Sequence, residues 1–253
     1  MLPRTPSFRL DGRRALVTGA GRGLGLACAA ALAEAGAEVW LAARSSSEIE
    51  AAAAALRARG DRAHALVLDV TDTAAVVHAI TVRGPFDVLV NNAGTNRPKP
   101  FDEVSEDDLD ALYTLNLKAP FFVAREVARR LKAAGRPGSI IQMSSQMGHV
   151  GGIGRTAYCA TKHALEGLTK ALALELGPHR IRVNTVCPTF IDTPMTHEWL
   201  AAPAFREHVL SKIALGRVGT VEDVMGAVLY LAGDASALVT GSALMVDGGW
   251  TAA

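Results

Sequence analysis

The chain has 253 residues, of which 49% are hydrophobic and 20% are charged, which is enough apolar material for a globular core. Its formal net charge is +1, so no basic field indicates a nucleic acid or an anionic membrane as partner. No apolar run is long enough to cross a membrane, no secretory signal opens the chain, and the three cysteines lack disulfide or metal-ligand spacing. We therefore expect a cytoplasmic protein without a metal site.

Short hydrophobic runs alternate with longer segments of helical periodicity along almost the whole chain. The runs are unbroken, as in strands covered on both faces, and they predict strands at 14–19, 38–43, 64–68, 86–90, 139–143, 181–187 and 243–246. The segments between them predict helices at 23–35, 47–59, 72–82, 105–134, 155–176, 197–213 and 220–232. Capping patterns mark three of the helix starts, namely Ser47 with Glu50, Ser105 with Asp108, and Thr220 with Asp223. This alternation predicts an α/β, doubly wound (Rossmann) fold with a seven-stranded parallel sheet and helices on both faces, built as one domain over residues 1–253.

A glycine-rich segment, TGAGRGLG at 18–25, follows the first predicted strand and opens the first predicted helix. Glycines at 19, 23 and 25 would let backbone amides approach a pyrophosphate, and the helix N-terminus adds partial positive charge. A purely structural turn is the alternative. The strand–turn–helix context favours a dinucleotide site.

Tyr158 and Lys162 lie four residues apart in a predicted helix, and therefore on one helical face. The pair alone is weak evidence, because chance produces such spacings. An ammonium one turn away favours the phenolate and lowers a tyrosine pKa. The pair is thus a candidate general acid and base for carbonyl reduction and alcohol oxidation.

Together these motifs resemble those of the short-chain dehydrogenase/reductase family over nearly the full length. Asn91-Asn92-Ala93-Gly94 follows the fourth strand, Asn116 lies within LNLKAPFF, and Ser145 precedes Tyr158 by 13 residues, as in that family. The resemblance implies a catalytic set of Asn116, Ser145, Tyr158 and Lys162, with Ser145 holding the reacting oxygen, Lys162 also contacting the nicotinamide ribose, and Asn116 holding a water. Ser145 as a strand-end turn residue and Asn116 as a local helix residue are the alternatives.

The cofactor site follows from the same resemblance, and NADP(H) is expected over NAD(H). Arg44 follows the second predicted strand, at whose end NAD-specific relatives often carry Asp. Arg22 lies in the glycine turn, so two guanidiniums could bind a 2′-phosphate. Solvated surface arginines are the alternative. Asp69 resembles the residue that contacts adenine, with a helix cap as its alternative role, and Thr189 departs from a glycine common in relatives, which puts that loop's geometry in doubt. The predicted cofactor residues are Gly19, Arg22, Gly23, Leu24, Gly25, Arg44, Asp69, Val70, Asn91, Ala93, Gly94, Tyr158, Lys162, Pro188, Ile191 and Thr193.

The substrate is predicted more coarsely. A lid over about 189–215 contains Phe190, Trp199 and Phe205, which could equally be core residues. The C-terminal VDGGW is closer to dehydrogenases of sugar acids and small keto compounds than to 3-oxoacyl-[acyl carrier protein] reductases, which remain the alternative. Candidate substrate contacts are Arg97, Gln146, His149, Arg155 and Trp199. The first four could equally be plain surface residues, and Trp199 could be a core residue.

The prediction is therefore an NADP-dependent oxidoreductase acting on CH–OH or C=O groups of a small polar keto or hydroxy compound. A sensor that binds NADP without turnover is the alternative from another class, and a methyltransferase would not need the Tyr–Lys pair. The apolar stripes of the helices at 105–134 and 155–176 resemble a family interface, which implies a homotetramer, or else a homodimer.

Overall fold

The protein is built around one parallel β-sheet, described here from a computed structural model in which residues 2–252 are defined. The sheet has seven strands in the order β3-β2-β1-β4-β5-β6-β7, and every pairing between them is parallel. The strands are β1 (Arg14–Thr18), β2 (Glu38–Ala43), β3 (Ala63–Val67), β4 (Val88–Asn91), β5 (Gly138–Met143), β6 (Ile181–Pro188) and β7 (Ala243–Val246). This confirms the predicted doubly wound architecture, because parallel neighbours require crossover helices.

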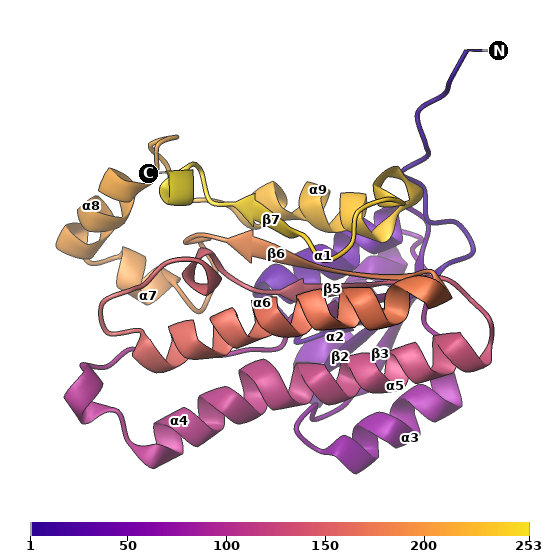
Figure 1. Ribbon diagram of the computed structural model, residues 1–253, viewed down its shortest axis with the longest axis horizontal. Coiled ribbons are helices and arrows are strands. Elements are labelled where there is room, and N and C mark those ends of the chain that lie inside the picture. The colour runs from indigo at the N-terminus through magenta and orange to yellow at the C-terminus, as the bar shows by residue number, and fades with distance from the viewer. Residues whose placement is uncertain (1, 253) are drawn as a thin grey trace.

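Helices cover both faces of the sheet, as Figure 1 shows. One face carries α1 (Gly23–Glu34), α2 (Ser46–Ala58) and α9 (Val221–Ala232), whose apolar side chains join Val17, Val39 and Ile141 in one core. The other face carries α3 (Thr73–Arg83), α5 (Ala119–Ala133) and α6 (Thr156–Leu176), packed with Leu16 and Ile140 in a second core. The two cores explain why the strands read as continuous hydrophobic runs. No helix within residues 2–252 combines the length and apolar character needed to span a bilayer.

Two predicted helices are interrupted in the structure, and a proline accounts for each interruption. The segment 105–134 forms α4 (Glu106–Tyr113), a π-helical turn (Thr114–Lys118) and α5. Pro120 has no N–H for the carbonyl four residues earlier, and the Ala119 N–H reaches back five residues to the Thr114 carbonyl. The segment 197–213 is split into α7 (His197–Leu200) and α8 (Pro203–Lys212), because a residue before proline avoids the helical conformation.

The helix caps are partly as predicted. Capping boxes are present at Ser105 with Asp108 and at Thr220 with Asp223. The prediction for α2 was wrong, because Ser45, and not Ser47, accepts the Glu48 N–H at 3.3 Å.

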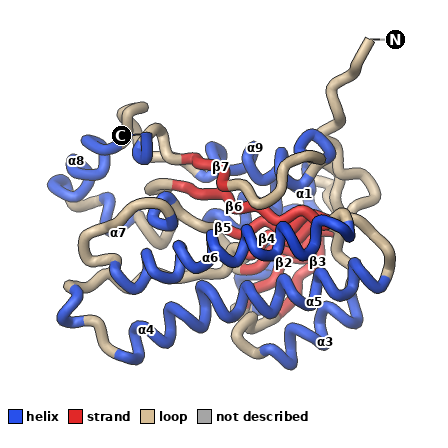
Figure 2. Tube along the Cα trace, viewed as in Figure 1, coloured by secondary structure: helices blue, strands red, loops and turns tan. Residues whose placement is uncertain are grey.

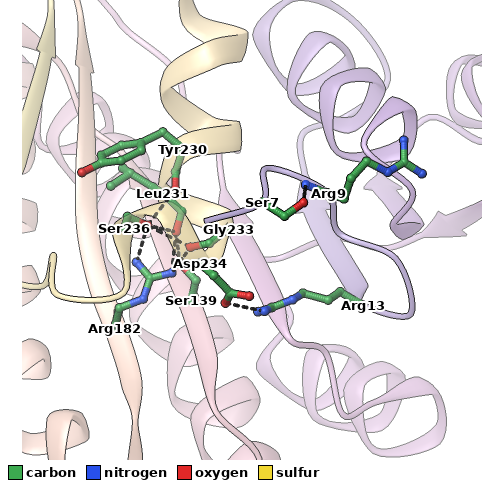
Figure 3. A network of polar contacts seen from close by, with 10 residues as sticks. All are labelled: Ser7, Arg9, Arg13, Ser139, Arg182, Tyr230, Leu231, Gly233, Asp234 and Ser236. Carbon is green, nitrogen blue, oxygen red and sulfur yellow. Dashed lines mark hydrogen bonds and ion pairs between the residues drawn. The ribbon is translucent and has the colours of Figure 1, made fainter. Parts of the chain in front are cut away.

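A polar network closes the amino end of the sheet, opposite the ends from which the functional loops emerge (Figure 3). Arg182, at the start of β6, donates to Ser236 Oγ at 2.9 Å and to the Leu231 carbonyl at 2.8 Å. Ser139 of β5 donates to the same carbonyl at 2.7 Å. These bonds satisfy the carbonyls at the end of α9 and fix that helix to β5 and β6. The carboxyl ends of the strands, drawn in red in Figure 2, are left for the site.

Candidate active site

The glycine turn between β1 and α1 is shaped for close approach of a ligand to backbone. Gly19 and Gly23 have φ values of +64° and +57°, in the left-handed region that favours glycine. A Cβ at Gly25 would lie 2.1 Å from the Gly19 carbonyl oxygen, so only glycine fits there. The N-cap residue of α1, Arg22, makes no side-chain cap bond. The first amides of α1 therefore remain available for an anion.

Asn92 braces this turn, a role that the sequence analysis missed. Its Nδ2 donates to the carbonyls of Thr18 and Gly19 at 3.0 and 3.2 Å. The predicted cofactor residue Asn91 instead donates to the Pro120 carbonyl at 3.0 Å and is buried away from the cavity. Alternation along β4 could have separated the two asparagines, because neighbouring strand residues point to opposite faces.

A cavity of about 970 Å³ opens along the carboxyl ends of the strands. Apart from Asn91, every predicted cofactor residue lines it: Gly19, Arg22, Gly23, Leu24, Gly25, Arg44, Asp69, Val70, Ala93, Gly94, Tyr158, Lys162, Pro188, Ile191 and Thr193. Thr189, whose hydroxyl is buried without a partner, lines it as well. This position, beside the glycine turn and in the crevice of a doubly wound sheet, fits a dinucleotide.

The end of the cavity beside β2 is rich in charged groups. Arg44 is exposed there, and Arg22 Nη1 lies 3.4 Å from Glu48 Oε1. Asp69 accepts two bonds from Thr71, from the backbone N–H at 2.9 Å and from the hydroxyl at 2.7 Å, and these bonds lower the pKa of its carboxyl. Asp69 is therefore not the helix cap, because Asp72 caps α3 through the Ala75 N–H.

Tyr158, Lys162 and Ser145 converge at the other end of the cavity. Lys162 Nζ donates to the Met143 carbonyl at 2.7 Å and lies 5.5 Å from the centre of the Tyr158 ring. Ser145 Oγ accepts the Met147 N–H at 3.1 Å, which leaves its proton free to donate. Burial lowers the pKa of Lys162 to about 8.

The surroundings of Tyr158 favour the protonated form of its hydroxyl. Burial raises its pKa to about 12, against the opposing effects of the Ser145 hydroxyl and then of the Arg155 charge. The sequence analysis took Lys162 as the cation that favours the phenolate. Arg155 is the cation that has this effect here.

Asn116 lies in the π-helical turn, and its side chain bonds to the loop after β4 and to α6. Its Oδ1 accepts the Thr95 N–H at 2.9 Å, and its Nδ2 donates to the Thr95 carbonyl at 2.9 Å and to Thr161 Oγ1 at 3.3 Å. The side chain thus ties the loop after β4 to α6, one residue before Lys162. Single π turns inside α-helices are frequent at functional sites.

The predicted substrate residues separate into different environments. The Arg155 guanidinium lies 4.7 Å from the Trp199 ring, and the residue is 7% exposed. Gln146 is buried with an unpartnered Oε1. Arg97 instead pairs with Asp108 at 3.2 Å and is partly solvated. His149 lies beside Glu166 and Cys187.

The aromatic residues of the predicted lid also separate. Phe190 packs against Phe205 and Trp250, with ring centres 5.6 and 5.7 Å apart, in a small core of the segment. Trp199 of α7 instead covers Arg155. Phe190 and Phe205 thus pack against a small core, whereas Trp199 contacts Arg155 and does not line the cavity.

Comparisons with known proteins agree with this geometry. A family model described as enoyl-(acyl carrier protein) reductase matches residues 19–251. The chain is 41% identical to L-xylulose reductase from Bos taurus over 97% of this chain and 99% of that protein. The structure of gluconate 5-dehydrogenase from Burkholderia cenocepacia, in complex with NADP and tartrate, superimposes with a TM-score of 0.93 at 38% identity, covering 97% of this chain and 98% of that one. A short-chain type dehydrogenase/reductase from Mycobacterium marinum matches with a TM-score of 0.91 at 37% identity, covering 97% and 98%.

Proposed function

This chain belongs to the short-chain dehydrogenase/reductase family, and from that premise we propose an NADP(H)-dependent interconversion of ketone and secondary alcohol on a small polyhydroxy carboxylate. The oxidoreductase class follows from the relatives, which are reductases and dehydrogenases of sugar-like compounds. We propose in addition that the cofactor is NADP(H), that the site residues have the roles given below, and that the substrate is negatively charged.

The proposal that the substrate has a carboxylate group rests on the Arg155 side chain. It is buried beside Tyr158, and within residues 2–252 it makes neither an ion pair nor a hydrogen bond, and its Nη1 is wholly buried. Burial also lowers its pKa. A buried cation without a partner is costly. A substrate carboxylate would supply the missing partner and could accept two parallel hydrogen bonds from the guanidinium.

Neighbouring groups support a polyhydroxylated chain on the same ligand. Gln146 offers a buried acceptor without a partner, which suits a substrate hydroxyl. Trp199 covers the guanidinium and would exclude water from the carboxylate contact. The relative crystallised with NADP and tartrate, a hydroxy dicarboxylate, is consistent with this chemistry.

The proposed mechanism uses the protonation state of Tyr158. Bound NADP(H) supplies or accepts the hydride. In reduction, Ser145 donates a hydrogen bond to the carbonyl oxygen, and Tyr158 delivers its proton to that oxygen as negative charge develops. A pKa of about 12 keeps this proton in place until then. In oxidation the tyrosine must accept the proton, and the positive charge of Arg155 then stabilises the phenolate.

NADP(H) is preferred in this proposal because of the residues at the end of β2. Arg44 has no acidic neighbour at 42 or 43 to repel a 2′-phosphate, and Arg22, which pairs with Glu48, belongs to the same cavity lining. A guanidinium recognises phosphate bidentately. The three free cysteines support a reducing compartment, so we propose a cytoplasmic location.

The test compares a ketogluconate with L-xylulose, a neutral ketose, using NADPH and NADH in turn. We expect NADPH and the acid to be preferred, and Arg155→Met to lower kcat/KM for the acid by at least ~100-fold while changing it little for the ketose, because a desolvated charge pair is lost. Arg97→Met is the matched control, since Arg97 already has Asp108 as partner. An equal loss on both substrates would contradict the carboxylate assignment.

Two further outcomes would overturn larger parts of the proposal. Tyr158→Phe should abolish turnover with both substrates while NADPH still binds, and undiminished turnover would remove Tyr158 as the acid. Binding of NADPH without turnover by the wild type would favour a sensor. Reduction of an acetoacetyl thioester far exceeding that of the acid would favour the acyl-thioester alternative.

A further inference from the structure

Three side chains with metal-binding atoms converge behind the catalytic turn. His149 follows the short helical turn Gln146–Gly148, Glu166 lies one turn beyond Lys162 on α6, and Cys187 lies near the carboxyl end of β6. Cys187 Sγ is 3.4 Å from His149 Nε2 and 3.4 Å from Glu166 Oε1, and the latter two atoms are also 3.4 Å apart. One imidazole nitrogen, one carboxylate oxygen and one sulfur thus form a nearly equilateral triangle.

This triangle has the dimensions of one face of a tetrahedral coordination sphere. With bonds of about 2.0 to 2.3 Å, two ligand atoms of a tetrahedral zinc site lie roughly 3.3 to 3.6 Å apart. An ion close to the centre of the triangle would lie about 2 Å from each atom. Nitrogen, oxygen and thiolate sulfur together suit zinc and similar divalent transition metals more than magnesium or calcium.

The surroundings of Glu166 favour a cation at this point. Its carboxylate is buried, and within residues 2–252 it forms no ion pair with a lysine or an arginine. Thr185 Oγ1 donates to Glu166 Oε2 at 2.9 Å, which orients the carboxylate and leaves Oε1 directed at the other two ligand atoms. Such outer contacts to a ligand carboxylate are typical of metal sites.

Ser144 offers a fourth donor atom beside Gly148, next to the cluster. The Ser144 hydroxyl is buried without a hydrogen-bond partner. A Cβ on Gly148 would lie 3.0 Å from Ser144 Oγ and 3.2 Å from Glu166 Cγ, so a larger residue here would crowd both side chains. The His149 side chain is 30% exposed, which gives an ion a route from solvent.

We propose that His149, Glu166 and Cys187 bind one divalent transition-metal ion of the zinc class, with Ser144 or a water as fourth ligand. The carboxylate and the cysteine thiolate neutralise the two positive charges of the ion. The ion connects the turn that carries Ser145 to α6, which carries Tyr158 and Lys162. It is a structural ion, and its role does not depend on the substrate proposed above.

Cobalt replaces zinc in such sites and reports their ligands by its spectrum. Full-length protein freed of metal with a chelator is titrated with Co²⁺ and then with Zn²⁺. We expect one ion per chain, a near-ultraviolet sulfur-to-cobalt charge-transfer band, the visible absorption of tetrahedral cobalt, and loss of both when zinc displaces it. Zinc should also raise the Tm, because an ion that binds only the folded state stabilises it.

Ligand variants localise the ion. Cys187→Ser should abolish the charge-transfer band, and His149→Gln and Glu166→Gln should each weaken zinc binding by at least ~10-fold. Cys159→Ser and His163→Gln are controls for the cysteine and histidine variants, because both residues lie on α6 near Glu166 but outside the triangle. Both should leave the spectrum unchanged. A wild-type protein that binds no zinc, a cobalt complex without the sulfur band, or a spectrum that changes with Cys159→Ser would overturn the site, and the wild-type spectrum decides even if a ligand variant fails to fold.

Discussion

At the scale of single residues, the site depends on charged groups that are held out of water. Lys162 and Arg155 flank Tyr158, and burial lowers the pKa of both cations. Each is kept charged at a cost in folding stability. Buried charges with shifted pKa values are common in active sites, where a ligand or a reaction uses the charge.

This cost gives a prediction for Lys162. Its folded pKa of about 8 is below the unfolded value of 10.5, so the unfolded chain binds more protons between these values. The cost in folding free energy of burying the charged lysine is therefore fully present below pH 8 and decreases as the pH rises toward 10.5. Across that interval the free energy of unfolding of the wild type should therefore rise by on the order of 3 kcal/mol relative to that of Lys162→Met, which lacks the titrating group.

Denaturant unfolding of both proteins from pH 7 to about 11 measures the difference. Groups common to both proteins cancel in this comparison. Lys170→Met, which removes an exposed lysine of the same helix, is the control and should parallel the wild type. A constant difference between Lys162→Met and the wild type would show that burial does not lower this pKa.

At the scale of elements, side chains from neighbouring elements brace the turns of the site, whereas α6 carries Tyr158 and Lys162. The glycine turn is braced by Asn92 from a neighbouring strand end, and Asn116 ties the loop after β4 to α6. Both braces are side chains that bond to backbone. The turns are therefore fixed without being covered, which leaves their amides accessible to a cofactor.

Gly25 is the position where this bracing is most sensitive. In Gly25→Ala the new methyl group would lie 2.1 Å from the Gly19 carbonyl and 2.5 Å from Asn92 Nδ2. The turn must then shift, so NADPH affinity should fall by at least ~10-fold and the Tm should drop. Fluorescence titration and thermal unfolding measure both quantities.

Gly167→Ala provides the matched control. Gly167 lies inside α6 with open space where the methyl group of an alanine would lie, so alanine should stabilise the helix by about 0.5 to 1 kcal/mol. If Gly25→Ala bound NADPH as tightly as Gly167→Ala, the turn would not be the phosphate site.

At the scale of the whole molecule, apolar side chains remain uncovered on one helical layer. Leu109 and Tyr113 of α4 and Phe121 of α5 are each about 40% exposed. Such a patch on a surface helix pair is typical of a protein–protein contact. We expect a homotetramer in which this layer contacts another subunit, with a dimer as the smaller alternative.

Light scattering coupled to gel filtration tests the assembly. Phe121→Glu should shift the wild-type particle to a smaller species, because a carboxylate would be buried in the contact. Val67→Glu at the end of β3, an exposed apolar position outside this helical layer, should leave the mass unchanged. A monomeric wild type at micromolar concentration would contradict the prediction.

The sequence predicted most of the cofactor cavity because short, local motifs form its lining. The glycine turn and the strand ends are local features, so fifteen of the sixteen predicted cofactor residues line the cavity. The exception is Asn91, which points away from the cavity. The motif alone does not distinguish it from Asn92, although the alternation of side chains along β4 could have done so. Pro203, which begins α8, could have predicted the division of the helix expected at 197–213.

The remaining features depend on contacts between distant residues. Arg155 is buried because Trp199, from a different helix, covers it. The separation of Arg97 from the site arises from its pairing with Asp108. The approach of Cys187 to His149 and Glu166 depends on how α6 lies across β6, and the sequence analysis accordingly expected no metal site. Tertiary packing decides all three, and spacing along the chain does not encode it.

The π-helical turn also keeps one line of side chains facing inward along a long helical segment. Asp108, Leu112, Asn116 and Pro120 are all buried, although they recur every fourth residue. In an unbroken α-helix with 3.6 residues per turn, that spacing drifts by about 40° at each step, or roughly 120° over the four residues. A turn that holds one additional residue takes up about 100° of this rotation. The wide turn thus restores the direction in which these side chains point. The same segment can therefore place Asp108, Asn116 and Pro120 on its buried side.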